Sequence, residues 1–185
     1  LACFKKALEH DPNCAMLDWG IVYAAGPFYN MPWIDFSEPE AAVCTSFCRG
    51  YLDKANALSD VTLPLEKALI NALSLRIQKP HIVCQPEYDA WDDAYADAMR
   101  QVNVDFPANK SVMTLCVDAT MTRTPWHMWD GQTCLPPKGA DTHEAIRLCK
   151  YASGLAGQRD EEQNTAMLHP QLHQLEMTTE PARAT

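Results

Sequence analysis

Apolar residues recur at the 3.6-residue period of an α-helix through most of the chain, and this pattern constrains the fold more than any other feature. Proline-containing segments interrupt the pattern at short intervals and divide the chain into successive amphipathic stretches. The strict alternation typical of half-buried β-strands is nearly absent. The pattern predicts an all-α fold of antiparallel helix hairpins, with helical ranges at 1–12, 14–26, 39–58, 62–77, 87–105, 109–121, 140–153 and about 170–177.

The spacing within each stretch also predicts which side chains face inward. Gly20 is small and would let a neighbouring helix approach closely. Asp92, Asp93 and Asp97 form an acidic helix face that we expect to be solvated. The positions expected to face inward on two of the later helices are Leu65, Leu69, Ala72, Leu73, Ile77, Trp91, Tyr95, Ala98, Met99 and Val102.

The first helical stretch gathers its apolar residues on one face. Phe4, Ala7 and Leu8 share that face, and Asp11-Pro12 is expected to end the helix. Because helical-repeat chains bury their core by stacking helix pairs, a chain that opens on the second helix of a pair would leave an apolar face uncovered. Such a face predicts a dimer, a preceding segment or an aggregation-prone end. An ordinary amphipathic first helix is the alternative.

The composition indicates a globular protein with an acidic surface. The 185 residues are 47% hydrophobic and 21% charged, which suits one domain or a short repeat array. A formal net charge of −9 would repel phosphate backbones and anionic lipid, so neither nucleic-acid nor membrane binding is expected. No apolar run approaches the roughly 20 residues that a membrane helix needs. The acidic balance instead favours a basic or apolar partner.

The eight cysteines are scattered along the chain and do not suggest a disulfide framework. Most lie in helical apolar patterns, where a free thiol packs as a small hydrophobe. No C-x2-C pair supports a structural zinc site. We therefore expect reduced thiols in a cytoplasmic protein. Cys44 and Cys48 lie one helical turn apart, which suits a metal or redox pair in principle, but we favour burial as hydrophobes.

Three passages resemble tetratricopeptide-repeat (TPR) proteins. The first is CFKKALEHDPNCAMLDWGIVYAAGPFYN, whose F-x2-A-L-x3-P spacing matches the end of the second helix of a repeat. The second is AYADAMRQVNVDFPANKSVMTLCVDATM, which has the same helix–proline–helix rhythm. The third, TRTPWHMWDGQTCLPPKGADTHEA, looks like a segment of large TPR-like proteins of bacteria and fungi.

The resemblance implies a TPR-like α-superhelix in which helix hairpins stack one on the next. It implies a repeat array over residues 1–153, whose first repeat is incomplete, followed by a polar linker and short helices at 154–185. The repeats are degenerate, because the consensus tryptophan position falls at Asp18 while Trp19 comes one residue later.

A candidate metal site lies near the end of the chain. His169, His173 and Glu176 are spaced i, i+4 and i+7, so their side chains would point the same way from a helix. Two imidazoles and one carboxylate can form a facial site for a divalent iron, copper or zinc ion. A solvated polar face is the alternative, because Pro170 allows a helix only to begin here.

The segment 122–139, rich in proline and glycine, is a candidate ligand-binding loop. Trp126 and Trp129 could wall a pocket for a flat apolar ligand. His127 would then act as a general acid–base, and Asp130 would orient it. The alternative is that the two tryptophans fill a gap between helix pairs.

A second aromatic group lies between the helices predicted at 14–26 and 39–58. Its members Tyr29 and Trp33 are candidate ligand-binding residues that would line a concave surface. The alternative is that the group, which also contains Phe28 and Phe36, covers the ends of the first two helices.

Two functions are compatible with these features. The first is a helical-repeat interaction protein that binds a protein partner, or another copy of itself, through an aromatic-lined face and needs no cofactor. The second is a metal-dependent enzyme on the same scaffold, acting oxidatively or hydrolytically on a small apolar molecule. The first is the interpretation that we favour.

Overall fold

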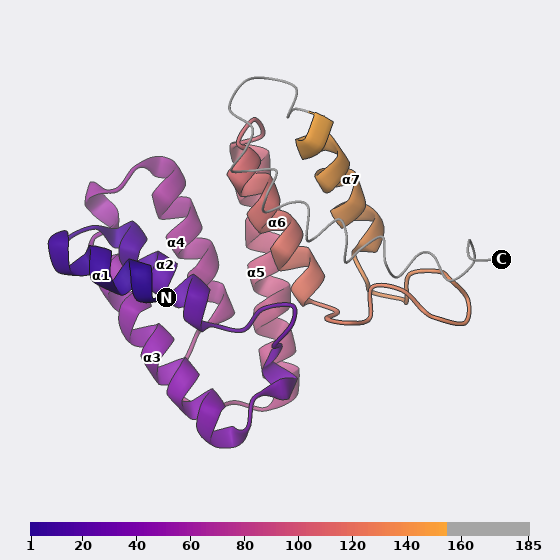
Figure 1. Cartoon of the computed structure of the whole chain (residues 1–185), viewed down its shortest axis with the longest axis horizontal. Coiled ribbons are helices and arrows are strands. Elements are labelled where there is room, and N and C mark those ends of the chain that lie inside the picture. Colours follow the sequence, from indigo (N-terminus) through magenta and orange to yellow (C-terminus); the bar gives the residue numbers. More distant parts are fainter. Residues whose placement is uncertain (155–185) are drawn as a thin grey trace. The chain divides into compact units, whose positions relative to one another are not determined.

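The computed structural model describes residues 1–154 (Figure 1). In these residues the regular elements are helices, and the one isolated β-bridge joins Phe28 to Met31. The all-α class predicted from the apolar period is therefore confirmed. The chain divides into two compact units, Leu1–Ala98 and Met99–Thr185. Within the part that is described, no helix has both the length and the apolar character needed to cross a membrane.

The first unit is built from consecutive helices that pack on their neighbours. Helix α2 lies against both α1 and α3, and α4 packs on α2 and α3. The elements of this unit are α1 (Ala2–His10), α2 (Ala15–Ala25), the 3-10 turn η1 (Trp33–Asp35), α3 (Glu38–Ala57), the 3-10 turn η2 (Ser59–Val61), α4 (Pro64–Arg76) and most of α5 (Gln85–Asp105).

The start of α3 is fixed by local sequence chemistry. The carboxylate of Glu40 accepts hydrogen bonds from the backbone N–H of Ser37 (2.9 Å) and from its hydroxyl (2.5 Å). Pro39 occupies the first turn, where a missing N–H costs nothing. These contacts satisfy a backbone donor that would otherwise have no partner at the helix end, and they fix the residue at which α3 begins.

A close contact between α1 and α2 depends on a glycine. A Cβ atom added to Gly20 would lie 2.5 Å from the Phe4 ring, so only glycine lets the ring sit this close. The small residue predicted to admit a neighbouring helix therefore does so. Helix α1 nevertheless buries none of its residues, and Phe4 remains 36% exposed. The apolar face of α1 is thus only partly covered by the described residues.

Replacing Gly20 by alanine is expected to loosen α1 rather than to unfold the unit. The new methyl group would displace the Phe4 ring, at a cost of about 1–3 kcal/mol for an overpacked contact. Hydrogen exchange of the α1 amides would measure the loosening. Gly50→Ala is the matched control, because Gly50 lies inside α3 with nothing within 4 Å of its added Cβ. That change should stabilise the helix by about 0.5–1 kcal/mol. A stabilising effect of both substitutions would contradict the contact.

The second unit pairs two helices that are joined by a long loop. The end of α5 is followed by α6 (Lys110–Thr122), whose first turn is capped by Asn109, and α6 packs against α7 (Thr142–Gly154). Arg100 forms ion pairs with Asp141 and Glu144, each at 2.8 Å, and Arg123 also pairs with Asp141. This network ties the end of the loop to α5 and α6.

Candidate functional site

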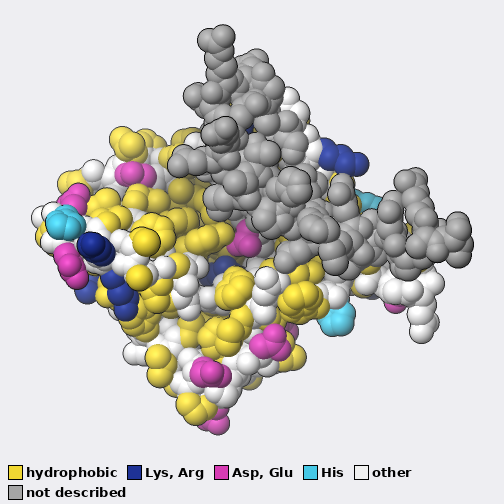
Figure 2. Space-filling view, viewed as in Figure 1, with side chains coloured by type: hydrophobic (Ala, Val, Ile, Leu, Met, Phe, Trp, Pro, Cys, Tyr) yellow, Lys and Arg dark blue, Asp and Glu magenta, His cyan; other side chains and the backbone are white. Residues whose placement is uncertain are grey.

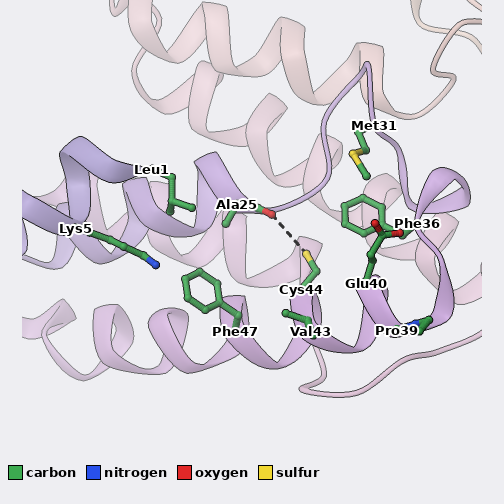
Figure 3. A pocket seen from close by; sticks show the side chains of 10 residues that line it. All are labelled: Leu1, Lys5, Ala25, Met31, Phe36, Pro39, Glu40, Val43, Cys44 and Phe47. Carbon is green, nitrogen blue, oxygen red and sulfur yellow. Dashed lines mark hydrogen bonds between the residues drawn. The ribbon is translucent and has the colours of Figure 1, made fainter.

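The candidate site is an open apolar groove of about 560 Å³ in the first unit (Figure 3). Its walls come from the start of α1, the end of α2, the connection that follows α2, and the first half of α3. We call it the α1–α3 groove. The lining residues used below are Leu1, Lys5, Ala25, Glu40, Val43, Cys44 and Phe47.

The walls of the groove are apolar and face solvent. Val43 is 69% exposed and Leu1 is 46% exposed, while Phe47 is half-buried. Figure 2 shows hydrophobic side chains gathered over the helices of the first unit on the visible face. Contiguous apolar surface of this kind marks sites where proteins bind partners or ligands.

The two ends of the groove carry opposite charges, as Figure 3 shows. At one end, the Lys5 ammonium lies 4.8 Å from the centre of the Phe47 ring, a cation–π contact. At the other end, the hydrogen bonds from Ser37 hold the pKa of Glu40 below its ordinary value, so its carboxylate is ionised at neutral pH. The α1–α3 groove is therefore apolar along its length, with the Lys5 ammonium at one end and the Glu40 carboxylate at the other.

Cys44 lines the groove, and Cys48 lies one helical turn further along α3 in the buried core. The Sγ of Cys44 donates to the carbonyl of Ala25 at 3.6 Å and lies 4.0 Å from the Sγ of Cys48. The Cys48 contact lowers the pKa of the Cys44 thiol, and the same contact together with burial raises the pKa of Cys48. All eight cysteines lie in the described residues and all are free, which confirms the prediction of unpaired thiols.

In the same unit, α4 and α5 share a buried ion pair. The Nε of Arg76 lies 3.3 Å from Oδ1 of Asp92, and the guanidinium also sits 5.0 Å from the Tyr95 ring. Desolvation outweighs the attraction of Arg76 and raises the pKa of Asp92 from 3.8 to about 6. The prediction that Asp92 is solvated is therefore wrong, whereas Asp93 and Asp97 are exposed as expected.

The predicted ligand-binding residues Tyr29 and Trp33 are both buried. The Trp33 ring stacks on Tyr88 with centroids 4.2 Å apart and meets Trp91 edge-on at 6.2 Å. Trp33, Tyr88 and Trp91 thus form a packed aromatic cluster, through which the 26–37 connection packs on α5. Trp33 also borders a separate cavity of about 290 Å³, so its role in ligand binding stays a prediction.

The predicted catalytic loop is ordered by its own polar groups. Oδ1 of Asp130 accepts hydrogen bonds from the backbone N–H groups of Gln132 (2.9 Å) and Thr133 (2.7 Å), and these lower its pKa. His127 is exposed, and its role as a general acid–base that Asp130 orients stays a prediction.

The two tryptophans of this loop lie in different environments. Trp129 is half-buried, and its ring meets that of His143 edge-on at 5.9 Å. Trp126 is 58% exposed and adopts a left-handed backbone φ of 63°, which is costly for a bulky side chain. The two tryptophan rings therefore differ in burial. That Trp126 and Trp129 wall one ligand pocket stays a prediction.

The predicted metal ligands His169, His173 and Glu176, like the predicted helix at 170–177, lie outside the described residues. Among residues 1–154, no group of three or more His, Cys, Asp or Glu side chains is placed to hold a metal ion. The proposed domain boundary at 153–154 coincides with the edge of the described residues and also stays a prediction.

Sequence reasoning missed two features of the first unit, one in the groove and one outside it. Lys5 and Glu40 lie in helices separated along the chain, so nothing local marked them as the two ends of one groove. Asp18, at the position of the consensus tryptophan, is buried, and burial raises its pKa. The available signal for Asp18 was its place in an otherwise apolar run between Leu17 and Trp19.

No protein-family model, no curated protein and no solved structure matches this chain. The likeness to TPR proteins is therefore carried by the quoted passages alone.

Proposed function

We propose that this chain is a TPR-like helical-repeat interaction protein that binds an amphipathic helix of a partner protein in the α1–α3 groove. One observation carries the proposal: an exposed apolar groove with Lys5 at one end and Glu40 at the other. The packing of α1 on α2, of α2 on α3 and of α3 on α4 supports a repeat architecture, since these helices lie against their neighbours in sequence.

The openness of the groove favours a helix over a small molecule. Pockets for small ligands commonly enclose about 70–90% of the ligand surface. The α1–α3 groove leaves Val43 69% and Leu1 46% exposed, so its walls are open to solvent, as suits a helix lying along the surface. Val43 and Phe47 lie one turn apart on α3 and present a ridge along the groove. A helix with apolar residues at i, i+3, i+4 and i+7 fits such a ridge.

The charges at the ends define the partner's chemistry. A helix lying along the groove would place an acidic residue near Lys5 and a basic residue near Glu40. Exposed ion pairs of this kind contribute at most about 1 kcal/mol each, so the affinity would come from the apolar face. The charges would mainly set the orientation of the helix in the groove.

The test uses a synthetic amphipathic peptide of about 14 residues that carries Glu at one end and Lys at the other. Its binding is measured by fluorescence anisotropy, alongside a peptide with the same apolar face and Lys at both ends. We expect the first peptide to bind several-fold more tightly. Val43→Asp should weaken its binding about tenfold or more, because a carboxylate would be buried against apolar side chains.

Ile34→Asp is the control, because Ile34 is an exposed apolar residue that does not line the groove. That variant should bind the peptide as the unaltered chain does. Equal binding to the Val43→Asp and Ile34→Asp proteins would refute the proposal. Sedimentation velocity separates another outcome: a dimer that dissociates in Val43→Asp would show that the occupant is a second copy and would also contradict a partner helix.

A further inference from the structure

Cys44, which lines the α1–α3 groove, and the buried Cys48 form a pair of thiols whose arrangement indicates a function of its own. The sulfurs of Cys44 and Cys48 lie 4.0 Å apart on consecutive turns of α3. Both cysteines are buried, Cys48 fully and Cys44 with 7% exposure, and Cys44 is the one that lines the groove. An ion that enters the groove would therefore meet Cys44 first and Cys48 directly behind it.

A direct disulfide does not fit this arrangement. Side chains four residues apart on a helix have Cβ atoms about 5–6 Å apart. A disulfide requires Cβ atoms about 3.5–4.5 Å apart and sulfurs about 2.05 Å apart. Closing the bond would distort the middle of α3, whose backbone is held by buried contacts at Thr45 and Leu52. The pair therefore suits an atom placed between the sulfurs better than a bond between them.

The geometry points to a two-thiolate site for one cuprous ion, Cu(I), bridging Cys44 and Cys48. Metal–sulfur bonds of about 2.3 Å to two sulfurs 4.0 Å apart give a sulfur–metal–sulfur angle of about 120°. Soft thiolates select Cu(I), and an angle near 120° leaves a third position, which would face the groove. A structural zinc site would need four ligands, and the described residues hold no group of three or more metal-ligating side chains.

The binding step conserves charge and involves no redox change. Two thiols bind one Cu(I), two S–H bonds are broken, and two protons leave to solvent, which gives a bis-thiolate complex of net charge −1. The contact with Cys48 lowers the pKa of the Cys44 thiol, and the buried Arg76 adds to that effect. The pKa of Cys48 stays raised by its contact with Cys44 and by burial, so the metal ion itself would have to displace the proton of Cys48. The complex would form near the ion pair of Arg76 with Asp92.

The experiment titrates reduced, desalted protein under nitrogen with Cu(I) in the presence of bicinchoninate, whose coloured Cu(I) complex reports the ion that the protein has not taken up. We expect the unaltered chain to withdraw one equivalent. Cys44→Ala and Cys48→Ala should each weaken this uptake by about 100-fold or more, because a single thiolate competes poorly with a bidentate chelator. Cys116→Ala, which removes a buried thiol elsewhere, should not change it.

Circular dichroism confirms that each variant is folded, and having two separate alanine variants keeps the test decisive if one of them unfolds. Uptake that is unchanged in both folded variants would place copper on the exposed Cys3, Cys84 or Cys134 and overturn the proposal. The absence of any withdrawal by the unaltered chain would overturn it as well. Peptide binding in the groove is measured separately, so either proposal can fail without the other.

Discussion

Replacing Arg76 by methionine is expected to lower the free energy of unfolding by about 3–5 kcal/mol at pH 8, the cost of removing one partner from a buried ion pair. The side chains of Arg76 and Asp92 are 2% and 11% exposed, and their charged atoms lie 3.3 Å apart. Methionine fills much of the space but supplies no charge. The Asp92 carboxylate would then remain buried and uncompensated. Urea denaturation with linear extrapolation measures the loss.

The same variant should show a characteristic dependence on pH. The pKa of Asp92 is raised from 3.8 to about 6, so the native state binds its proton more tightly than the unfolded state does. In the unaltered chain, the stability contributed by this carboxyl group therefore falls as the pH rises from about 4 to about 6. Without Arg76 the pKa of Asp92 would rise further. The stability difference between variant and unaltered chain should accordingly be largest above pH 6 and at least halved at pH 4.5.

Two controls isolate the effect of burial. Lys67→Met removes an ion pair with Asp60 that is exposed, and it should cost no more than about 1 kcal/mol. The double variant Arg76→Met/Asp92→Leu should recover most of the loss, since a buried ion pair can be replaced by apolar side chains at little cost. A loss below 1 kcal/mol in Arg76→Met at pH 8, or a loss that does not vary with pH, would show that Asp92 is not a buried, ionised group.

The helices themselves were predictable because their signals are local. Helix α3 was expected at 39–58 and spans Glu38–Ala57, and its start is set by Ser37, Pro39 and Glu40 acting within four residues of one another. Helix α4 was expected at 62–77 and spans Pro64–Arg76. Four of its five predicted inward positions, Leu69, Ala72, Leu73 and Ile77, are buried.

The partnership of Asp92 with Arg76 was not predictable in this way. The period of α5 places Asp92 beside Asp93 on a charged face, and most carboxylates on such faces are solvated. What buries Asp92 is a guanidinium from another helix, 16 residues earlier in the chain. A pattern within one helix carries no information about the residue that a neighbouring helix brings to it.

The groove illustrates the same limit for a binding site. Val43, Phe47 and Tyr51 fall on one stripe of α3, while Cys44, Cys48 and Leu52 fall on the adjacent stripe. Both stripes are largely apolar, so the burial expected for Cys44 and Cys48 did not imply that Val43 would stay exposed. The structure buries the cysteine stripe and leaves Val43 exposed. The groove forms because α3 packs on α2 through the stripe of Cys44, Cys48 and Leu52 and leaves the stripe of Val43 at the surface.

Replacing Trp33 by alanine is expected to lower the free energy of unfolding by about 3–5 kcal/mol, because a large ring would leave a cavity in the core. Trp33 is 3% exposed and contacts Tyr88, Trp91 and Phe36. Urea denaturation again measures the loss. Ile34→Ala is the matched control, because this neighbour is 70% exposed and should shift the free energy by no more than about 0.5 kcal/mol.

Trp33→Phe separates the packing of the ring from its polar group. The Trp33 Nε1 atom is buried and has no hydrogen-bond partner among the described residues, so phenylalanine removes an unsatisfied donor together with part of the ring. The loss in this variant should be less than half of that in Trp33→Ala. If Trp33→Ala instead kept the stability of the unaltered chain, the ring would not be a packing element. Trp33 would then have to be assigned to ligand binding at the cavity it borders.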